Sequence, residues 1–157
     1  MMKFRTLFGT LALLLSLTPS VHAQTCTPLL VVKGDGISVT KRVSAPNAGI
    51  LPIVPVGYRG NWDTDFAIPS HVNFSSYVAT VQSASEDPAS YKVKMYLKYS
   101  DDTADKVFND TVRLQPGELQ QMSGIPRSAT QPYQVNLNVG GMDAIGHSYT
   151  ISVAGCP

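Results

Sequence analysis

The clearest pattern in the chain is a strict alternation of apolar and polar residues between positions 91 and 99. Tyr91, Val93, Met95, Leu97 and Tyr99 fall on one side, and Lys92, Lys94 and Lys98 fall on the other. A period of two is typical of a half-buried antiparallel strand, whereas a helix would scatter the lysines around its circumference. The segment is therefore predicted to be a strand with its apolar side inward.

The same alternation recurs towards the end of the chain. Residues 133–139 place Tyr133, Val135, Leu137 and Val139 inward, and residues 149–153 do the same with Tyr149, Ile151 and Val153. The link 140–146 is rich in glycine, which predicts a hairpin between these two strands. A further strand is predicted over 107–114, because it ends at the turn formers Gln115-Pro116-Gly117-Glu118.

The first half of the chain alternates less regularly. Strands are predicted over 29–33 and 37–43, on either side of a Gly34-Asp35-Gly36 hairpin turn, and again over 62–68 and 77–82. Residues 44–55 hold Pro46, Pro52 and Pro55, and proline cannot donate to a central ladder, so this segment is predicted to be an irregular crossing or an edge. Only 117–123 is compatible with a short helical turn, and it has no apolar stripe.

Short strands separated by turns, without long helical runs, predict an all-β fold. The pattern gives about 7 to 8 strands at spacings of about 8 to 15 residues, which favours an antiparallel two-sheet sandwich over alternating β and α units. An immunoglobulin-like topology is the first expectation, and a jelly roll is the alternative.

The N-terminal segment has the three parts of a secretory signal peptide. Lys3 and Arg5 precede an apolar run over 7–17, and a small residue, Ala23, ends the segment. The run is shorter than the roughly 18 residues that span a bilayer. We expect residues 1–23 to be removed and residues 24–157 to form one domain, secreted, periplasmic or at the cell surface, with no membrane span after processing.

The two cysteines, Cys26 and Cys156, lie at opposite ends of the expected mature chain. Exported proteins usually oxidise an even number of cysteines, and two cysteines allow one pairing. We therefore predict a disulfide that brings the first and last strands together.

Charge gives little indication of a charged partner. Removing Lys3 and Arg5 leaves 10 of the 12 basic residues against 11 acidic ones, a net charge of −1. The sequence shows no basic stripe for nucleic acid or anionic lipid. Neutral or protein partners are expected.

Catalytic and cofactor motifs do not stand out. The expected mature chain has two histidines, His71 and His147, and no Gly-x-Ser-x-Gly elbow, phosphate loop, His-Glu-x-x-His or Cys-x-x-Cys spacing. We expect no enzyme activity and no cofactor.

The segment 57–66 has the most unusual composition, with the single tryptophan among aromatic, basic and acidic residues. Its candidate ligand-binding residues are Tyr58, Arg59, Trp62, Asp63 and Asp65. Sugar sites combine flat rings with carboxylates and amides. The competing interpretation is that Trp62 packs in the core.

A weak calcium candidate lies between two predicted strands, where Asp101, Asp102 and Asp105 cluster. Calcium prefers such oxygen ligands, but the calcium-loop spacing is absent and aspartate is also common in turns. We therefore expect no metal.

Taken together, these features predict an exported, non-enzymatic sandwich that acts as a structural, adhesive or protein-interaction module, with sheet-edge pairing or self-assembly as one mode. The alternative is a carbohydrate-binding module that uses the segment Tyr58–Phe66.

Overall fold

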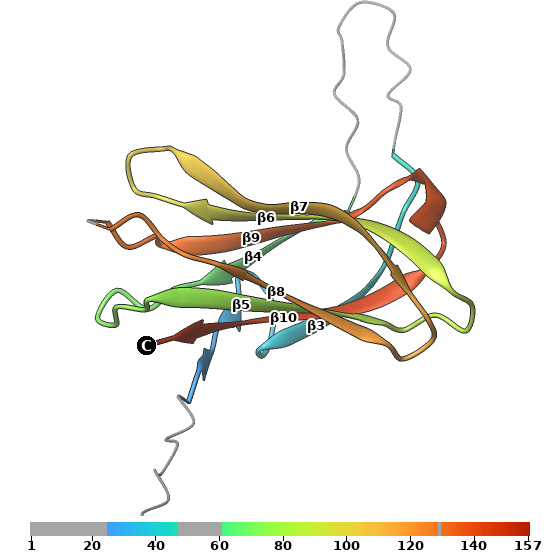
Figure 1. Cartoon of the computed structure of the whole chain (residues 1–157), viewed down its shortest axis with the longest axis horizontal. Coiled ribbons are helices and arrows are strands. Elements are labelled where there is room, and N and C mark those ends of the chain that lie inside the picture. Colours follow the sequence, from blue (N-terminus) through green and yellow to red (C-terminus); the bar gives the residue numbers. More distant parts are fainter. Residues whose placement is uncertain (1–24, 47–60, 129) are drawn as a thin grey trace, which may run out of the picture.

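The computed structural model describes residues 25–46, 61–128 and 130–157, which form two packed antiparallel sheets (Figure 1). The strands are β1 (Thr27–Pro28), β2 (Leu30–Val31), β3 (Ser38–Arg42), β4 (Asp63–Ala67), β5 (Ser76–Ser83), β6 (Ala89–Lys98), β7 (Ala104–Leu114), β8 (Leu119–Gly124), β9 (Gln134–Gly140) and β10 (Ser148–Cys156). A short 3₁₀ turn, η1 (Met142–Ala144), precedes β10. In these parts of the chain we find no helix with the length and hydropathy of a membrane span.

The strand order confirms the predicted antiparallel sandwich and favours the jelly-roll alternative. The first sheet has the order β10–β5–β8, with β1 and β3 both paired to the free side of β10; the second sheet has the order β2–β4–β9–β6–β7. From β3 onward successive strands change sheet, except for the β6–β7 hairpin. An immunoglobulin fold instead keeps its first two strands in one sheet, so the alternating order matches a jelly roll.

Two predicted hairpins are wrong for the same reason. The strands at 133–139 and 149–153 correspond to β9 and β10, which lie in different sheets, and the same holds for β2 and β3. Alternation indicates which side of a strand is buried, but it does not say which strand lies beside it. A glycine-rich link is equally suited to a crossing between sheets.

Residues 117–123, the one segment that was compatible with a short helical turn, instead contain a turn and most of strand β8. β8 pairs with β5 from Leu119 opposite Gln82 to Gly124 opposite Tyr77. Met122 is its only buried large side chain, because β8 is a sheet edge and contacts the core at alternate positions only. One buried apolar residue is too weak a signal for sequence reasoning.

The inward positions predicted for β6, β9 and β10 form a large part of the core, together with buried residues of β4 and β5 such as Phe66 and Tyr77. The residues Tyr91, Val93, Met95, Leu97, Val135, Leu137, Val139, Tyr149 and Ile151 are fully buried. Tyr91 and Tyr149 meet edge to face with ring centroids 5.9 Å apart, across the two sheets. Tyr133 was expected inward but is 52 % exposed, because β9 begins one residue later.

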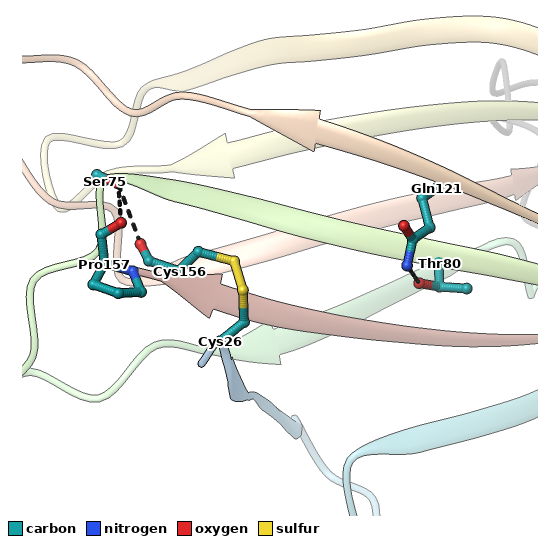
Figure 2. Close-up of a disulfide and its surroundings, with 6 residues drawn as sticks. All are labelled: Cys26, Ser75, Thr80, Gln121, Cys156 and Pro157. Carbon is teal, nitrogen blue, oxygen red and sulfur yellow. Dashed lines mark hydrogen bonds between the residues drawn. A yellow bond between two sulfur atoms is a disulfide. The ribbon is translucent and has the colours of Figure 1, made fainter. Parts of the chain in front are cut away.

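The predicted disulfide is present and joins the two ends of the described sandwich (Figure 2). Cys26 and Cys156 have Cα atoms 4.2 Å apart, beside the β1–β10 pairs Thr27–Gly155 and Pro28–Ala154. The hydroxyl of Ser75 donates to the carbonyl oxygen of Pro157 at 2.6 Å, which holds the last residue against β5. The expected signal segment 1–23 lies outside the described residues.

Candidate functional site

The outward side of the second sheet carries a continuous set of polar side chains on β4, β9 and β6, here called the polar face. Its members are Asp63, Asp65, Lys92, Lys94, Tyr96, Lys98, Gln134, Asn136 and Asn138. Strand register aligns them in rows across the sheet. One row runs Asp63, Asn138, Lys94, and the next runs Asp65, Asn136, Tyr96.

Hydrogen bonds between strands hold this face in place. Asp65 Oδ1 accepts from Asn136 Nδ2 at 2.8 Å and from Lys98 Nζ at 3.0 Å. One row away, Asn138 Nδ2 donates to Asp63 Oδ1 at 3.1 Å. Within the described residues, the second carboxylate oxygen of Asp63 and the side-chain carbonyl oxygen of Asn138 have no hydrogen-bond partner and can bond a ligand. Binding then costs less side-chain entropy, because the side chains are already ordered.

The network also fixes the charge state of Asp65. Burial raises the pKa of this carboxyl group, but hydrogen bonds from Asn136 and Lys98 outweigh burial and leave the pKa below its usual value. The group is therefore ionised at neutral pH and accepts hydrogen bonds only. Asn136, 6 % exposed, sits between β4 and β6 as a buried amide whose donor is satisfied.

The residues predicted from segment 57–66 separate into three groups. Asp63 and Asp65 lie on the polar face, and Tyr58 and Arg59 lie outside the described residues. Trp62 is half-buried: its indole N–H donates to the carbonyl oxygen of Ser44 at 3.0 Å, and its ring packs over Gly140. Trp62 thus packs at the margin of the core and does not offer a free platform.

Sequence reasoning missed Asn136, Asn138 and Tyr96 as site residues. Each was visible as a polar or amphipathic residue on the outer side of a predicted strand. Their convergence with Asp63 and Asp65 depends on β9 lying between β4 and β6. That strand order was not readable from the sequence.

The calcium candidate is an ion-pair cluster with an arginine. Arg127 forms two 2.8 Å contacts with the carboxylate of Asp105 and one of 3.5 Å with Asp101, and its guanidinium lies 4.1 Å from the ring centre of Tyr99. Arg127 lowers the pKa of Asp105, and hydrogen bonds from Thr103 lower the pKa of Asp101. Within the described residues no group of three or more histidine, cysteine or acidic side chains is arranged to hold a metal ion.

The two histidines do not form a catalytic pair with a nucleophile in the described structure. His147 lines an open cleft of about 380 Å³ with Arg42, Ser85, Glu86 and Asp87. The Ser85 hydroxyl accepts from the backbone N–H of Ser148 at 2.7 Å and lies 3.2 Å from the Ser148 carbonyl oxygen. The Ser85 hydroxyl is therefore engaged by backbone groups of Ser148.

The strand edges beside the polar face are covered. On β4, Leu30 and Val31 pair with Ala67 and Phe66, and the Val32 N–H donates to the Asp65 carbonyl oxygen at 2.8 Å. Further along the same edge, Lys41 Nζ donates to the carbonyl oxygens of Asp63 and Asn61 at 2.7 and 3.2 Å. A partner strand would have to displace these donors.

The outward side of the first sheet is different, with hydroxyl and amide side chains and little charge. Thr40 and Thr150 bond each other at 2.7 Å, and Gln121 Nε2 lies 3.5 Å from the Thr80 hydroxyl (Figure 2). A shallow groove of about 370 Å³ near the disulfide is lined largely by apolar atoms and includes Pro28 and Ile37. Two of the polar residues that line this groove, Thr80 and Gln121, already contact each other.

No family model matches the chain, and no curated protein is similar to it in sequence. Among solved structures, the chain is similar to a mutant of a family 29 carbohydrate-binding module, with 13 % identity over 86 % of this chain and 90 % of that one and a TM-score of 0.39. It is also similar to the CBM22-1 xylan-binding domain of Paenibacillus barcinonensis Xyn10C, with 14 % identity, 85 % and 89 % coverage and a TM-score of 0.35.

A third similar structure is the Clostridium thermocellum endo-1,4-beta-D-xylanase Xyn10B, solved as its CBM22-1 and GH10 modules with xylohexaose. The identity is 10 %, the TM-score is 0.37, and the match covers 59 % of this chain and 19 % of the xylanase chain. The present chain thus spans about a fifth of that structure. These similarities are too distant to indicate a ligand, so the ligand is inferred from the chain's own surface.

Proposed function

We propose that the protein is an exported, non-catalytic module that binds carbohydrate on the polar face of its second sheet. The observation that carries the proposal is the ordered network in which Asp65 accepts from Asn136 and Lys98 while Asp63 accepts from Asn138. Planar amides and carboxylates on adjacent strands offer donors and acceptors side by side, which is what neighbouring sugar hydroxyls require.

The rest of the face has the other element that a sugar site needs. Tyr96 is half-buried on β6, opposite Asn136 on one side and Lys106 on the other. Its ring adds apolar surface for the C–H side of a sugar, and its hydroxyl adds a polar end. A sheet face of this kind suits an extended chain of sugars better than a single small molecule, because the side chains extend over several rows.

Export is supported by the Cys26–Cys156 bridge, because such bridges persist in oxidising compartments. Removal of residues 1–23 is part of the proposal. N-terminal sequencing of the exported protein is expected to begin at Gln24; a mature protein that starts at Met1 would contradict this part.

Affinity electrophoresis in gels that contain defined polysaccharides tests the binding function. We expect the mobility of the wild type to be retarded by at least one of them, with binding about tenfold weaker in Asn138→Ala and in Tyr96→Ala, the loss expected for one or two hydrogen bonds and an aromatic contact. Asn138→Ala removes an amide from the face, and Tyr96→Ala removes the ring.

Gln121→Ala is the matched control, because Gln121 is an exposed amide on the outward side of the first sheet. Its binding is expected to equal that of the wild type, and all three variants must unfold at a similar temperature. Unaltered mobility in every polysaccharide would contradict the proposed function. Weaker binding in Gln121→Ala alone would show that the ligand binds the first sheet instead of the second.

A further inference from the structure

We propose that the ligand is an acidic polysaccharide, whose carboxylate groups bind four cations that line up on β6 and β7. These residues, here called the basic strip, are Arg113, Lys92, Lys94 and Lys106. The inference rests on the proposed carbohydrate function and names the class of sugar chain that this surface selects.

Strand register creates the strip from two separate segments of the sequence. Arg113 lies opposite Ser90, Lys92 opposite Thr111, Lys94 opposite Asn109 and Lys106 opposite Tyr96. Each of these four rows therefore contributes one cation, and neighbouring rows are about 7 Å apart along a strand. A bulge in β7 between the rows of Met95 and Tyr96 keeps Lys106 on the outward side.

The strip is not neutralised by the protein. In the described parts of the chain, carboxylates lie within 4 Å of Lys98 and Arg127, but none lies that close to any member of the strip. β7 contains two acidic residues: Asp105 is paired with Arg127, and Asp110 lies opposite the buried Val93, with its carboxylate accepting from the Thr111 N–H at 2.7 Å. The strip thus holds four uncompensated positive charges in a chain with 12 basic and 11 acidic residues.

Such a concentration of charge on a nearly neutral protein favours a polyanion. The summed field of four cations attracts an anionic chain and raises its association rate, whereas a neutral chain gains nothing from it. Asn109 and Thr111 stand between the cations as exposed hydrogen-bonding side chains. Charged and uncharged partners therefore alternate, as carboxylates and hydroxyls do along a polyuronate.

The acidic side of the same face argues against nucleic acid or an anionic bilayer. Asp63 and Asp65 lie two strands from β6, across β9, and both carboxylates point outward. A phosphate backbone or a lipid surface presents negative charge over a broad area, so these two groups would oppose it. A single sugar chain can set its acidic groups against the strip on β6 and β7 and turn its hydroxyl groups towards the amides of β9 and the carboxylates of β4.

The test compares acidic polysaccharides with their own neutral esters, so that sugar composition stays constant. The probes are polygalacturonate, alginate and hyaluronan, each with its esterified form, together with neutral xylan and mannan. Binding of the oxidised protein is measured by affinity electrophoresis. We expect at least one acidic chain to bind at least tenfold more tightly than its ester, and binding to weaken as sodium chloride screens the charges.

Variants locate the effect on the strip. The double variant Lys92→Gln/Lys94→Gln is expected to weaken binding to that acidic chain about tenfold, as two partly exposed ion pairs allow. Each single variant is compared with Arg42→Gln, which removes one positive charge from the exposed outward side of β3 in the first sheet and is expected to bind like the wild type.

The outcomes separate the inference from the function on which it rests. Equal binding to acid and ester, unaffected by the double variant, would overturn the acidic specificity and leave carbohydrate binding intact. Binding to none of the polysaccharides would overturn both. Binding to duplex DNA or to phosphatidylserine vesicles as tightly as to any acidic polysaccharide would assign the strip to another class of polyanion.

Discussion

Gly140 lies beside the indole ring of Trp62, and the space where its side chain would begin is already filled. A Cβ atom built on Gly140 would meet ring atoms of Trp62 at 2.2 to 2.7 Å. The indole in turn is held by its hydrogen bond to the Ser44 carbonyl oxygen, so the ring has little freedom to move. The missing side chain on β9 is therefore part of how Trp62 packs.

The prediction is that Gly140→Ala destabilises the protein by about 1 to 3 kcal/mol, the usual cost of overpacking. The loss depends on the ring, so Gly140→Ala should cost much less in a Trp62→Ala background. Urea unfolding of the two single variants and the double variant measures this coupling. If the losses in unfolding free energy of the two single variants sum to that of the double variant within about 0.5 kcal/mol, the two residues do not interact.

Tyr77 is a buried tyrosine whose hydroxyl donates to Gln131 Oε1 at 3.0 Å. Burial raises its pKa from 10.0 to about 12, and burial also raises the pKa of Tyr149. Between pH 10 and about pH 12 the unfolded chain loses the Tyr77 proton, while the folded protein retains it. Stability from this group is complete below the unfolded pKa and is lost as the pH rises towards the folded one.

We therefore predict that the free energy of unfolding falls steeply from about pH 10 to about pH 12. Urea unfolding at several alkaline pH values measures the slope. Tyr77→Phe removes one titrating group and keeps the ring, so its slope should be shallower than that of the wild type. An identical slope in the two proteins would contradict the assignment to Tyr77.

At the scale of strands, the sequence predicted which side of a strand is buried much better than it predicted which strands pair. The alternation in β6, β9 and β10 predicted nearly every inward residue, because burial of one side is a local property of a strand. β8 was missed since Met122 is its only large buried residue, and two hairpins were wrong since pairing partners depend on the whole fold.

Because pairing partners were not predictable, only part of the polar face was predicted from the sequence. Asp63 and Asp65 stood out by composition, within a short segment of unusual residues. Asn136 and Asn138 did not, because they come from a strand 71 and 75 residues away and meet the aspartates only through the β4–β9 register. The basic strip was missed for that reason too, since Lys106 and Arg113 join Lys92 and Lys94 only across β6 and β7.

β7 is an edge strand with features that discourage pairing with another chain. It contains a bulge, and Asp110, an exposed charged residue, occupies a register position opposite the buried Val93, on the side of the sheet that faces the core. Bulges and inward-pointing charges are known ways of protecting a sheet edge from association. The structure thus gives a reason why this edge would stay unpaired, which bears against self-assembly through β7.

We predict that the wild type is a monomer and that Asp110→Val promotes association, because the variant removes the inward charge and adds a β-branched residue. Size exclusion with light scattering at increasing concentration measures the mass. Thr111→Val is the control, since it makes a similar change on the outward side and should stay monomeric. A wild type that already dimerises, or an Asp110→Val variant that does not, would contradict this role of the edge.

For the molecule as a whole, the disulfide closes a loop that includes nearly every described residue. Cys26 and Cys156 are separated by 130 positions, and chain-entropy reasoning gives about 4 to 5 kcal/mol for so large a loop. The core is nevertheless large, with both sheets contributing fully buried side chains. The bridge is therefore expected to add stability to a fold that is specified by its core.

The double variant Cys26→Ser/Cys156→Ser should keep its β-rich circular dichroism spectrum and unfold at lower denaturant, with about 3 to 5 kcal/mol less stability. Urea unfolding of the oxidised wild type and the double variant measures the difference. A variant that is unfolded in buffer would show that the core alone does not suffice, and an unchanged midpoint would show that the bridge contributes nothing.

The two outward surfaces of the sandwich make the clearest contrast in the molecule. The first sheet presents hydroxyl pairs such as Thr40 with Thr150, which satisfy each other. The second sheet presents ordered amides and carboxylates next to uncompensated cations. Since both sheets share one core, a ligand that binds the second sheet should leave the first unperturbed.

Nuclear magnetic resonance titration of the isotopically labelled protein with oligosaccharides from the polysaccharide that it binds most tightly tests this most directly. We predict amide shift changes along β4, β9, β6 and β7, centred on Asn136 and Asn138, and none beyond noise on the outward positions of β10, β5 and β8. Shift changes confined to β10, β5 and β8, or no changes with any sugar, would contradict carbohydrate binding by the second sheet.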